Sequence, residues 1–230
     1  MPEPDLYQNQ TELYDLLVSR EDHLGRLMPA LQALSPLADR EVVEAGAGSG
    51  RLTFLLAARA AFVRAFDLTE QMLVRAEKNR RARSVENCSF AVADTRSLPV
   101  ESNSADLAVE GWSVLEMAGW EGARWKEAVD GAVEEMARVT RPGGTIVLIE
   151  TLGTLKEKPD GPERFRDHYR FLERKKRLQC TWVRTDYRFE SVDQAVGLVG
   201  FFFGGEMARE VRRRGNAVVP ECTGLWWRRV

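Results

Sequence analysis

A strand-like apolar stretch, a glycine-spaced turn and a helix-like stretch follow one another between residues 42 and 58. The turn has glycine at every second position, Gly46, Gly48 and Gly50, and Glu44 stands two residues before the first of them. Glycine has no Cβ, so the backbone can turn sharply there and can come close to a bound molecule. This unit predicts an α/β fold in which ligands bind at the carboxyl ends of parallel strands.

The spacing of the glycines argues against a dinucleotide site. The dinucleotide fingerprint is G-x-G-x-x-G, which leaves bare amides at a helix N-terminus for a pyrophosphate. Counted from Gly46, the third glycine position holds Arg51, and counted from Gly48 it holds Thr53. Glu44 would repel a diphosphate but suits a ligand that is cationic at that end. S-adenosylmethionine, which has an ammonium, a sulfonium and no phosphate, therefore fits the turn better than a nicotinamide cofactor.

Three further acids, Asp67, Asp94 and Glu110, each follow an apolar stretch typical of a strand. Asp67 stands about twenty residues beyond the glycines, where an acid can accept hydrogen bonds from ribose hydroxyls. That feature alone does not separate the two cofactors, because nicotinamide enzymes use it too. Each single acid also has the alternative of a solvated helix cap. Together, however, the acids mark the carboxyl ends of several strands, where an open α/β sheet binds its ligand.

The motif Glu-x-Gly-x-Gly-x-Gly with these later acids resembles the class I S-adenosylmethionine-dependent methyltransferases. Arg-Pro-Gly-Gly at 141–144, followed by an apolar stretch, is also similar to that family, so the resemblance covers residues 40–150. It implies S-adenosylmethionine as cofactor and S-adenosylhomocysteine as product, with an acid at the third strand meeting the adenine. The residues that we expect to bind the cofactor are Glu44, Gly46, Gly48, Gly50, Asp67, Leu68, Met72, Asp94, Thr95, Glu110 and Gly111. For Met72, simple core packing is an equal alternative.

The same resemblance implies a Rossmann-like, seven-stranded, mostly parallel sheet with helices on both faces and an antiparallel last strand. At 230 residues the chain is expected to form a single domain, 1–230. We divide it into an N-terminal helical lid at 1–38, a cofactor-binding core at 40–150 and substrate-side elements at 151–230. The periodicity and breakers predict helices over 125–139, 162–178 and from the Ser191 cap to 214, a turn at 141–144, and strands over 181–189 and 217–228.

The composition is that of an ordinary soluble protein and suggests a cytoplasmic location. The first residues are acidic and have no apolar core of a signal sequence, and the longest apolar stretch, 196–203, is too short for membrane insertion. The three cysteines have no C-x-x-C spacing and the chain has two histidines, so we expect neither a disulfide framework nor a metal site.

Candidates for the substrate pocket are aromatic residues outside the motifs. Tyr7 and Tyr14 lie in amphipathic segments before the first strand, which in similar enzymes cover the cofactor, although packing against the core is an equal alternative. Trp112 follows the fourth strand. His168 has an imidazole that can take a proton near neutral pH, with Tyr169 beside it. An exposed helix position is the alternative for His168, and no catalytic residue is assigned.

Motifs that are missing from the sequence narrow the range of possible methyl acceptors. Glu110-Gly111-Trp112-Ser113 stands where enzymes that methylate nucleobase amino groups have Asn/Asp-Pro-Pro-aromatic. The basic run 209–214 is explained as the solvated end of a helix, so no nucleic-acid partner is expected. The remaining resemblance is to bacterial small-molecule methyltransferases of the ubiquinone/menaquinone-biosynthesis type (methyltransferase type 11). A protein that binds the cofactor without catalysis, or a nicotinamide-dependent oxidoreductase, remain as alternatives.

Overall fold

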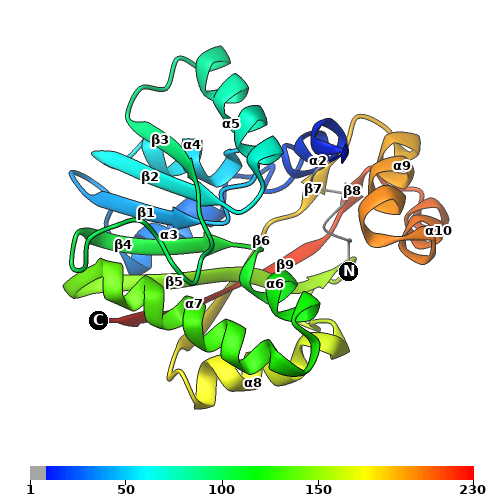
Figure 1. Cartoon of the computed structure of the whole chain (residues 1–230). Coiled ribbons are helices and arrows are strands. Elements are labelled where there is room, and N and C mark those ends of the chain that lie inside the picture. Colours follow the sequence, from blue (N-terminus) through cyan, green and yellow to red (C-terminus); the bar gives the residue numbers. More distant parts are fainter. Residues whose placement is uncertain (1–8) are drawn as a thin grey trace.

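A computed structural model describes residues 9–230, in which seven strands form one sheet in the order β3-β2-β1-β4-β5-β9-β6 (Figure 1). Neighbouring strands are parallel except that β9 is antiparallel to both β5 and β6. The predicted mostly parallel sheet with an antiparallel last strand is thus confirmed. The strands of this sheet are β1 (Glu41–Ala45), β2 (Phe62–Asp67), β3 (Cys88–Val92), β4 (Ala105–Gly111), β5 (Thr140–Thr154), β6 (Gln179–Arg184) and β9 (Glu221–Arg229).

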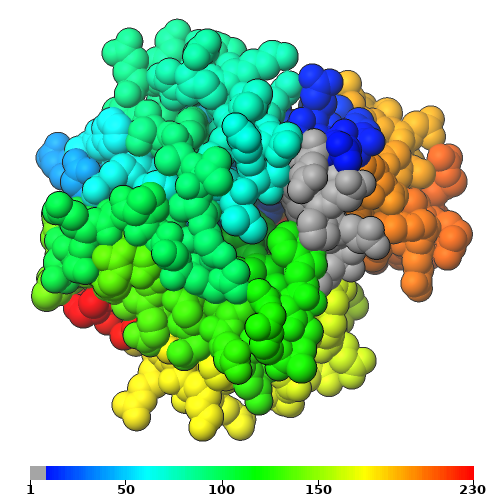
Figure 2. Space-filling view, in the orientation of Figure 1, coloured from blue at the N-terminus to red at the C-terminus, as the bar shows by residue number. Residues whose placement is uncertain are grey.

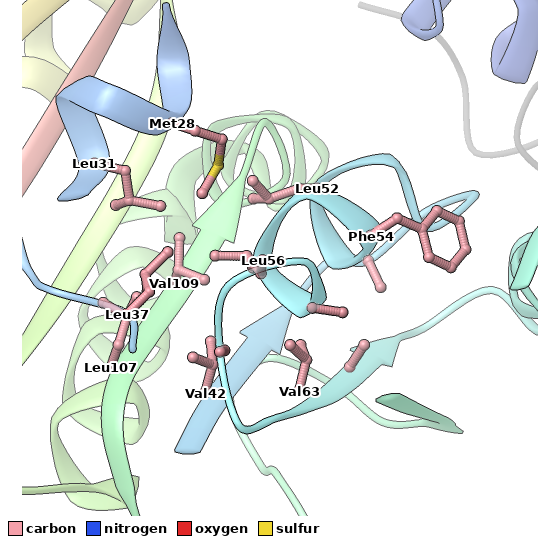
Figure 3. Close-up of a cluster of buried hydrophobic side chains, with 14 of the residues drawn as sticks. Met28, Leu31, Leu37, Val42, Leu52, Phe54, Leu56, Val63, Leu107 and Val109 are labelled. Carbon is pink, nitrogen blue, oxygen red and sulfur yellow. The ribbon is translucent and has the colours of Figure 1, made fainter. Parts of the chain in front are cut away.

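Helices cover both faces of the sheet because successive side chains of its buried strands point to opposite sides. Val42 of β1 packs with helices α3 and α4, together with Leu107 and Val109 of β4 (Figure 3). Val43 packs on the other face with helices α6 and α7. The helices that lie against the sheet are α3 (Leu27–Leu34), α4 (Arg51–Ala57), α5 (Glu70–Ala82), α6 (Val114–Trp120), α7 (Trp125–Val139) and α8 (Arg166–Arg174).

A third hydrophobic cluster lies beyond the end of the sheet and joins segments that are far apart in the sequence. It packs Leu17 of α2 against Tyr187 and against Val199 of α9. Figure 2 shows the α9–α10 segment as a lobe beside the sheet, next to α2. The elements of this region, which we call the cap, are α2 (Thr11–Val18), β7 (Tyr187–Arg188), α9 (Val192–Phe203), α10 (Gly205–Arg214) and β8 (Val218–Val219).

Five predicted elements differ from the structure. The expected strand 217–228 is two strands, β8 and β9, with Pro220 between them. The helix expected to run to 214 is two helices, because Gly204 between them has φ +94°. The segment 141–144 belongs to the long strand β5 instead of a separate turn, and Gly143 donates to the carbonyl of Val230 at 2.7 Å. The expected strand 181–189 divides into β6 and β7, and the expected helix 162–178 is helical only over α8 after a short 3-10 turn. No helix within residues 9–230 has both the length and the apolar composition to cross a membrane.

Candidate functional site

The glycine turn between β1 and α4 has the left-handed backbone that its sequence predicts. The φ values are +73° at Gly46, +54° at Gly48 and +87° at Gly50, a region that residues with a Cβ rarely adopt. At Gly46 an added Cβ would lie 2.3 Å from Oγ of Ser113, the residue before α6. The turn therefore brings the end of β1 directly against the end of β4.

Asp67, the last residue of β2, holds the glycine turn through its carboxylate. Oδ2 accepts a hydrogen bond from the Gly48 amide at 2.8 Å and Oδ1 accepts one from the Thr69 amide at 2.8 Å. Burial raises the pKa of Asp67, and these hydrogen bonds act in the opposite direction. Because each carboxylate oxygen has two lone pairs, the side chain can still accept a hydrogen bond from a ligand.

Asp94, two residues beyond β3, is held by Arg96. The guanidinium donates from Nε to Oδ1 at 2.9 Å and from Nη2 to Oδ2 at 2.6 Å, and Arg96 also reaches Glu121 at 2.6 Å. The hydrogen bonds from Arg96 keep the pKa of the Asp94 carboxyl below its usual range. Asp94 is therefore an anion whose orientation is fixed by a planar, two-pronged partner.

These residues line one groove at the carboxyl edge of the sheet. Its volume is about 110 Å³. Met72 is 1% exposed at its wall, whereas Leu68 is 61% exposed at its rim. The predicted cofactor residues that line the groove are Gly46, Gly48, Asp67, Leu68, Met72, Asp94, Thr95 and Gly111.

A second, larger cavity of about 370 Å³ adjoins this groove. Both are lined by Tyr14, Gly46, Gly111, Trp112 and Glu116, so they meet where β1 and β4 end. The larger cavity extends from there under the cap, and its further wall is formed by β5, β9, α2 and α9. An elongated ligand and a second, smaller one could thus lie end to end.

Glu44 lines the larger cavity and not the groove. Its side chain is 1% exposed, and Thr53 donates to its Oε2 at 2.6 Å. Burial raises the pKa of Glu44 to about 8. A cation placed beside Glu44 would favour its charged form, so the residue suits the ammonium end of a ligand whose remainder lies in the groove.

The comparisons with known proteins identify the segment that carries the glycine turn and the acids. Residues 43–148 match the family model described as Methyltransferase domain. Residues 43–148 are thus identified as an S-adenosylmethionine-dependent methyltransferase domain. The groove fits S-adenosylmethionine, because the glycine turn lets a ligand approach the backbone closely and the fixed carboxylates of Asp67 and Asp94 lie at the ends of neighbouring strands.

Two named relatives match part of the chain, one above and one below 30% sequence identity. The malonyl-[acyl-carrier protein] O-methyltransferase of Erwinia pyrifoliae is 36% identical over 118 residues, 50% of this chain and 39% of that protein. The demethylmenaquinone methyltransferase of Clavibacter sepedonicus is 29% identical over 149 residues, 63% of this chain and 56% of that protein. The chain thus spans about half the length of the curated relatives it matches.

A solved structure extends the likeness over the whole described fold. The SAM-dependent methyltransferase from Aquifex aeolicus superposes with a TM-score of 0.60, covering 96% of this chain and 98% of that chain at 16% identity. At that identity the comparison shows the fold alone. The cap and the strands after β5 therefore lie within the part of the chain that this fold comparison covers.

Two of the residues predicted to bind the cofactor have structural contacts instead. Glu110 is fully buried, lines neither cavity, and accepts hydrogen bonds from the backbone amides of Ser113 at 3.1 Å and Val114 at 3.3 Å. It thus satisfies the first amides of α6, which would otherwise lack partners. Gly50 also lines neither cavity; an added Cβ there would lie 2.8 Å from the ring of Phe54.

The candidates for the substrate pocket divide in a similar way. Tyr14 and Trp112 line both cavities, and the Arg51 guanidinium lies 4.5 Å from the centre of the Trp112 ring. His168 and Tyr169 line neither of these two cavities. Tyr7 falls outside the described residues.

His168 and Tyr169 belong instead to the packing between α8 and the sheet. The His168 ring is centred 4.1 Å from that of Trp125, and burial lowers the pKa of the imidazole. The Tyr169 hydroxyl donates to the carbonyl of Thr151 at 2.7 Å, and its ring stacks on Trp226 at 5.0 Å. The α8 sequence has both polar and aromatic sides, and periodicity did not indicate which of them the sheet would cover.

Several residues of the larger cavity were missed by sequence reasoning. Glu21 and Glu221 lie 200 positions apart, yet both are buried and line this cavity. Glu21 is paired with Arg51 at 2.9 Å and accepts a hydrogen bond from Thr185 at 3.0 Å. No local motif marks these acids. The one sequence signal was a glutamate shortly before the apolar run Leu225-Trp226-Trp227 of the last strand.

Proposed function

We propose that this protein transfers a methyl group from S-adenosylmethionine to a small-molecule acceptor. The observation that supports this most is the junction of the groove with the larger cavity at Trp112, Gly46 and Tyr14. A cofactor held in the groove would have its reactive end at the junction, and an acceptor in the larger cavity would approach from the other side. The proposed acceptor is small because the larger cavity is about 370 Å³.

In this proposal four sets of residues hold the cofactor. Asp67 accepts from the ribose hydroxyls, Asp94 with Thr95 meets the adenine, and the glycine turn allows close approach of the backbone. Glu44 receives the ammonium. When bound, the cofactor supplies an electrophilic methyl group on a positively charged sulfur.

The protein's own contribution is mainly positioning. Tyr14 and Trp112 stand at the junction and restrict how two ligands can meet there. Holding two reactants in line removes much of the entropic barrier, which effective molarities place at about 7–11 kcal/mol in the best cases. The mechanism therefore needs no nucleophile from the protein, and we assign none.

The first experiment measures binding of S-adenosylhomocysteine by calorimetry. We expect binding to the wild-type protein and a loss of roughly tenfold or more in Asp67→Ala, because a hydrogen bond to a charged acceptor contributes about 1.5–3 kcal/mol. Asp167→Ala is the matched control, since Asp167 is 76% exposed on α8. Equal affinity in all three proteins would contradict the assigned groove.

The second experiment separates methyl transfer from binding alone. Cofactor labelled on the methyl group is incubated with the protein and a metabolite extract, and we expect label in an acceptor with wild type but not with Asp67→Ala. Binding of S-adenosylhomocysteine without any labelled product would favour a non-catalytic protein. Binding of NADH in place of S-adenosylhomocysteine would support an oxidoreductase.

A further inference from the structure

The wall of the larger cavity away from the groove holds a buried carboxylate. Glu221, the first residue of β9, is 2% exposed and lines this cavity. Its Oε1 accepts a hydrogen bond from the Thr151 hydroxyl at 2.6 Å. Its Oε2 is buried and makes no hydrogen bond of good geometry within residues 9–230, although the Thr154 side chain lies close enough to lower the pKa of the carboxyl. A buried acceptor left in this way costs free energy that a donor group on a ligand would recover.

The cavity has more acids than cations around it. Its acidic lining residues are Glu21, Glu44, Glu116, Glu150, Asp160 and Glu221, and its basic ones are Arg51, Lys156 and Arg164. Two of these cations are already paired, Arg51 with Glu21 at 2.9 Å and Lys156 with Asp160 at 2.5 Å. The third, Arg164, lies 4.5 Å from the ring centre of Phe165.

Aromatic rings line the same space as Glu221. They come from three parts of the chain, namely Phe165 before α8, Tyr187 of β7, and Phe202 and Phe203 at the end of α9. Ring faces attract cations, and their surfaces accept the carbon skeleton of an organic molecule. Carboxylates and aromatic rings together are the surroundings that favour an organic ammonium.

Other acceptor classes fit this wall less well. A carboxylate or phosphate brings acceptor atoms where the wall already presents acceptors, and two of the three cations near it are already paired with acids. A neutral hydroxyl could donate one hydrogen bond to Glu221 but would add no charge attraction. A protonated amine supplies several N–H donors and a positive charge at once, and such charge-assisted hydrogen bonds are about twice as strong as neutral ones.

We propose that the larger cavity binds an acceptor that carries a protonated amine, with the ammonium donating to Oε2 of Glu221 and the carbon skeleton against the aromatic rings. The inference rests on the proposed function, since it takes the occupant of this cavity to be the methyl acceptor. It names the chemical class of that acceptor and a residue that recognises it.

The test compares three probes that share one carbon skeleton, 2-phenylethylamine, 2-phenylethanol and phenylacetate. Their dissociation constants are measured by ligand-observed NMR titration at pH 7, without cofactor. We expect the amine to bind about tenfold more tightly than the alcohol, and phenylacetate to bind most weakly. This ranking is measured on the wild-type protein, so it does not depend on how a variant folds. Phenylacetate or the alcohol binding as tightly as the amine would overturn the proposal.

Glu221→Gln then tests the residue itself, and Glu163→Gln is the matched control because Glu163 is 87% exposed beside the cavity. We expect the preference for the amine over the alcohol to disappear in Glu221→Gln and to persist in Glu163→Gln. An unchanged preference in both variants would overturn the assignment to Glu221. If S-adenosylhomocysteine binds and the amine preference is absent, this inference fails alone. If the preference is present but S-adenosylhomocysteine does not bind, the proposed function fails and the amine site remains.

Discussion

Replacing Gly46 and Gly48 separately by alanine should have very different costs, although both residues have positive φ. The φ values are +73° and +54°, so each alanine carries backbone strain of about 1–2 kcal/mol. At Gly48 the nearest atom to the new Cβ is Cε of Met72, at an ordinary 3.5 Å. At Gly46 the new Cβ would lie 2.3 Å from Oγ and 2.4 Å from Cβ of Ser113, so Ser113 has to move.

Moving Ser113 has its own cost. Its amide and hydroxyl donate to Oε2 of Glu110 at 3.1 Å and 3.0 Å, at the start of α6. Crowding a packed site costs about 1–3 kcal/mol. Added to the backbone strain, this gives about 2–5 kcal/mol for Gly46→Ala, against about 1–2 kcal/mol for Gly48→Ala.

The assay is urea unfolding followed by circular dichroism, with the free energy of unfolding of each variant extrapolated to water. Ser113→Gly gives a second background in which the obstructing Cβ and Oγ are removed. In that background the cost of Gly46→Ala should fall to about that of Gly48→Ala, a coupling of roughly 1–3 kcal/mol. The reasoning is refuted if Gly46→Ala costs the same with and without the Ser113 side chain, because the close approach of β1 and β4 would then not be its cause.

The other predictions concern the buried acid Glu44, the substrate-pocket candidate Tyr169, and the two proposals. The pKa of Glu44 is raised from 4.5 to about 8 by burial, so the folded state holds a proton that the unfolded state releases, and stability falls as the pH rises between those values. Glu44→Gln should therefore gain stability relative to wild type by about 1.4 kcal/mol per pH unit across that window in urea titrations, and a difference independent of pH would contradict it. Tyr169→Phe should lower the free energy of unfolding by about 1 kcal/mol, because the hydrogen bond to the Thr151 carbonyl is lost, and should leave the affinity for S-adenosylhomocysteine unchanged. Weaker binding of S-adenosylhomocysteine would instead support a place for Tyr169 in the ligand pocket. Asp67→Ala should weaken S-adenosylhomocysteine binding, and Glu221→Gln should abolish the preference for 2-phenylethylamine over 2-phenylethanol.

The site residues that could be predicted from sequence are those whose position is fixed by the strand or turn directly beside them in the chain. Asp67 and Asp94 directly follow short apolar strands, and parallel pairing of β1, β2 and β3 brings the ends of those strands to one edge. No long-range information was needed to expect both acids in one groove. The glycine turn was also predictable from local sequence, because glycine is the residue type that adopts positive φ values readily.

The parts that were not predicted depend on which face of an element the tertiary structure covers. Glu110 follows a strand as the other acids do, but its carboxylate is taken up by the first amides of α6. His168 lies on a helix with aromatic and charged sides, and packing against Trp125 decided its burial. The meeting of Glu21 and Glu221 requires α2, β7 and β9 to close around one space, which periodicity within any one of them does not reveal.

The four buried glutamates at the ends of neighbouring strands connect stability with ligand choice. Glu44 of β1, Glu110 of β4, Glu150 of β5 and Glu221 of β9 are each at most 2% exposed. Burial raises the pKa of every one, so each costs the protein stability when it is charged. Two of them have other partners, since Glu110 binds the start of α6 and Glu150 accepts from the Leu115 amide at 2.8 Å.

Glu44 and Glu221 differ from that pair because each accepts a hydrogen bond from a threonine hydroxyl and not from a helix amide, and each lines the larger cavity, as Glu150 also does. A positive charge bound beside either would lower its pKa and offset the cost of burial. Near pH 7 the carboxyls of Glu44 and Glu221 hold protons in the free protein, and a cation that lowers their pKa would release them. Proton release on binding therefore reports contact between the bound cation and these carboxyls. Calorimetry in buffers of different ionisation enthalpy can therefore locate a bound cation at this edge of the sheet without reference to turnover.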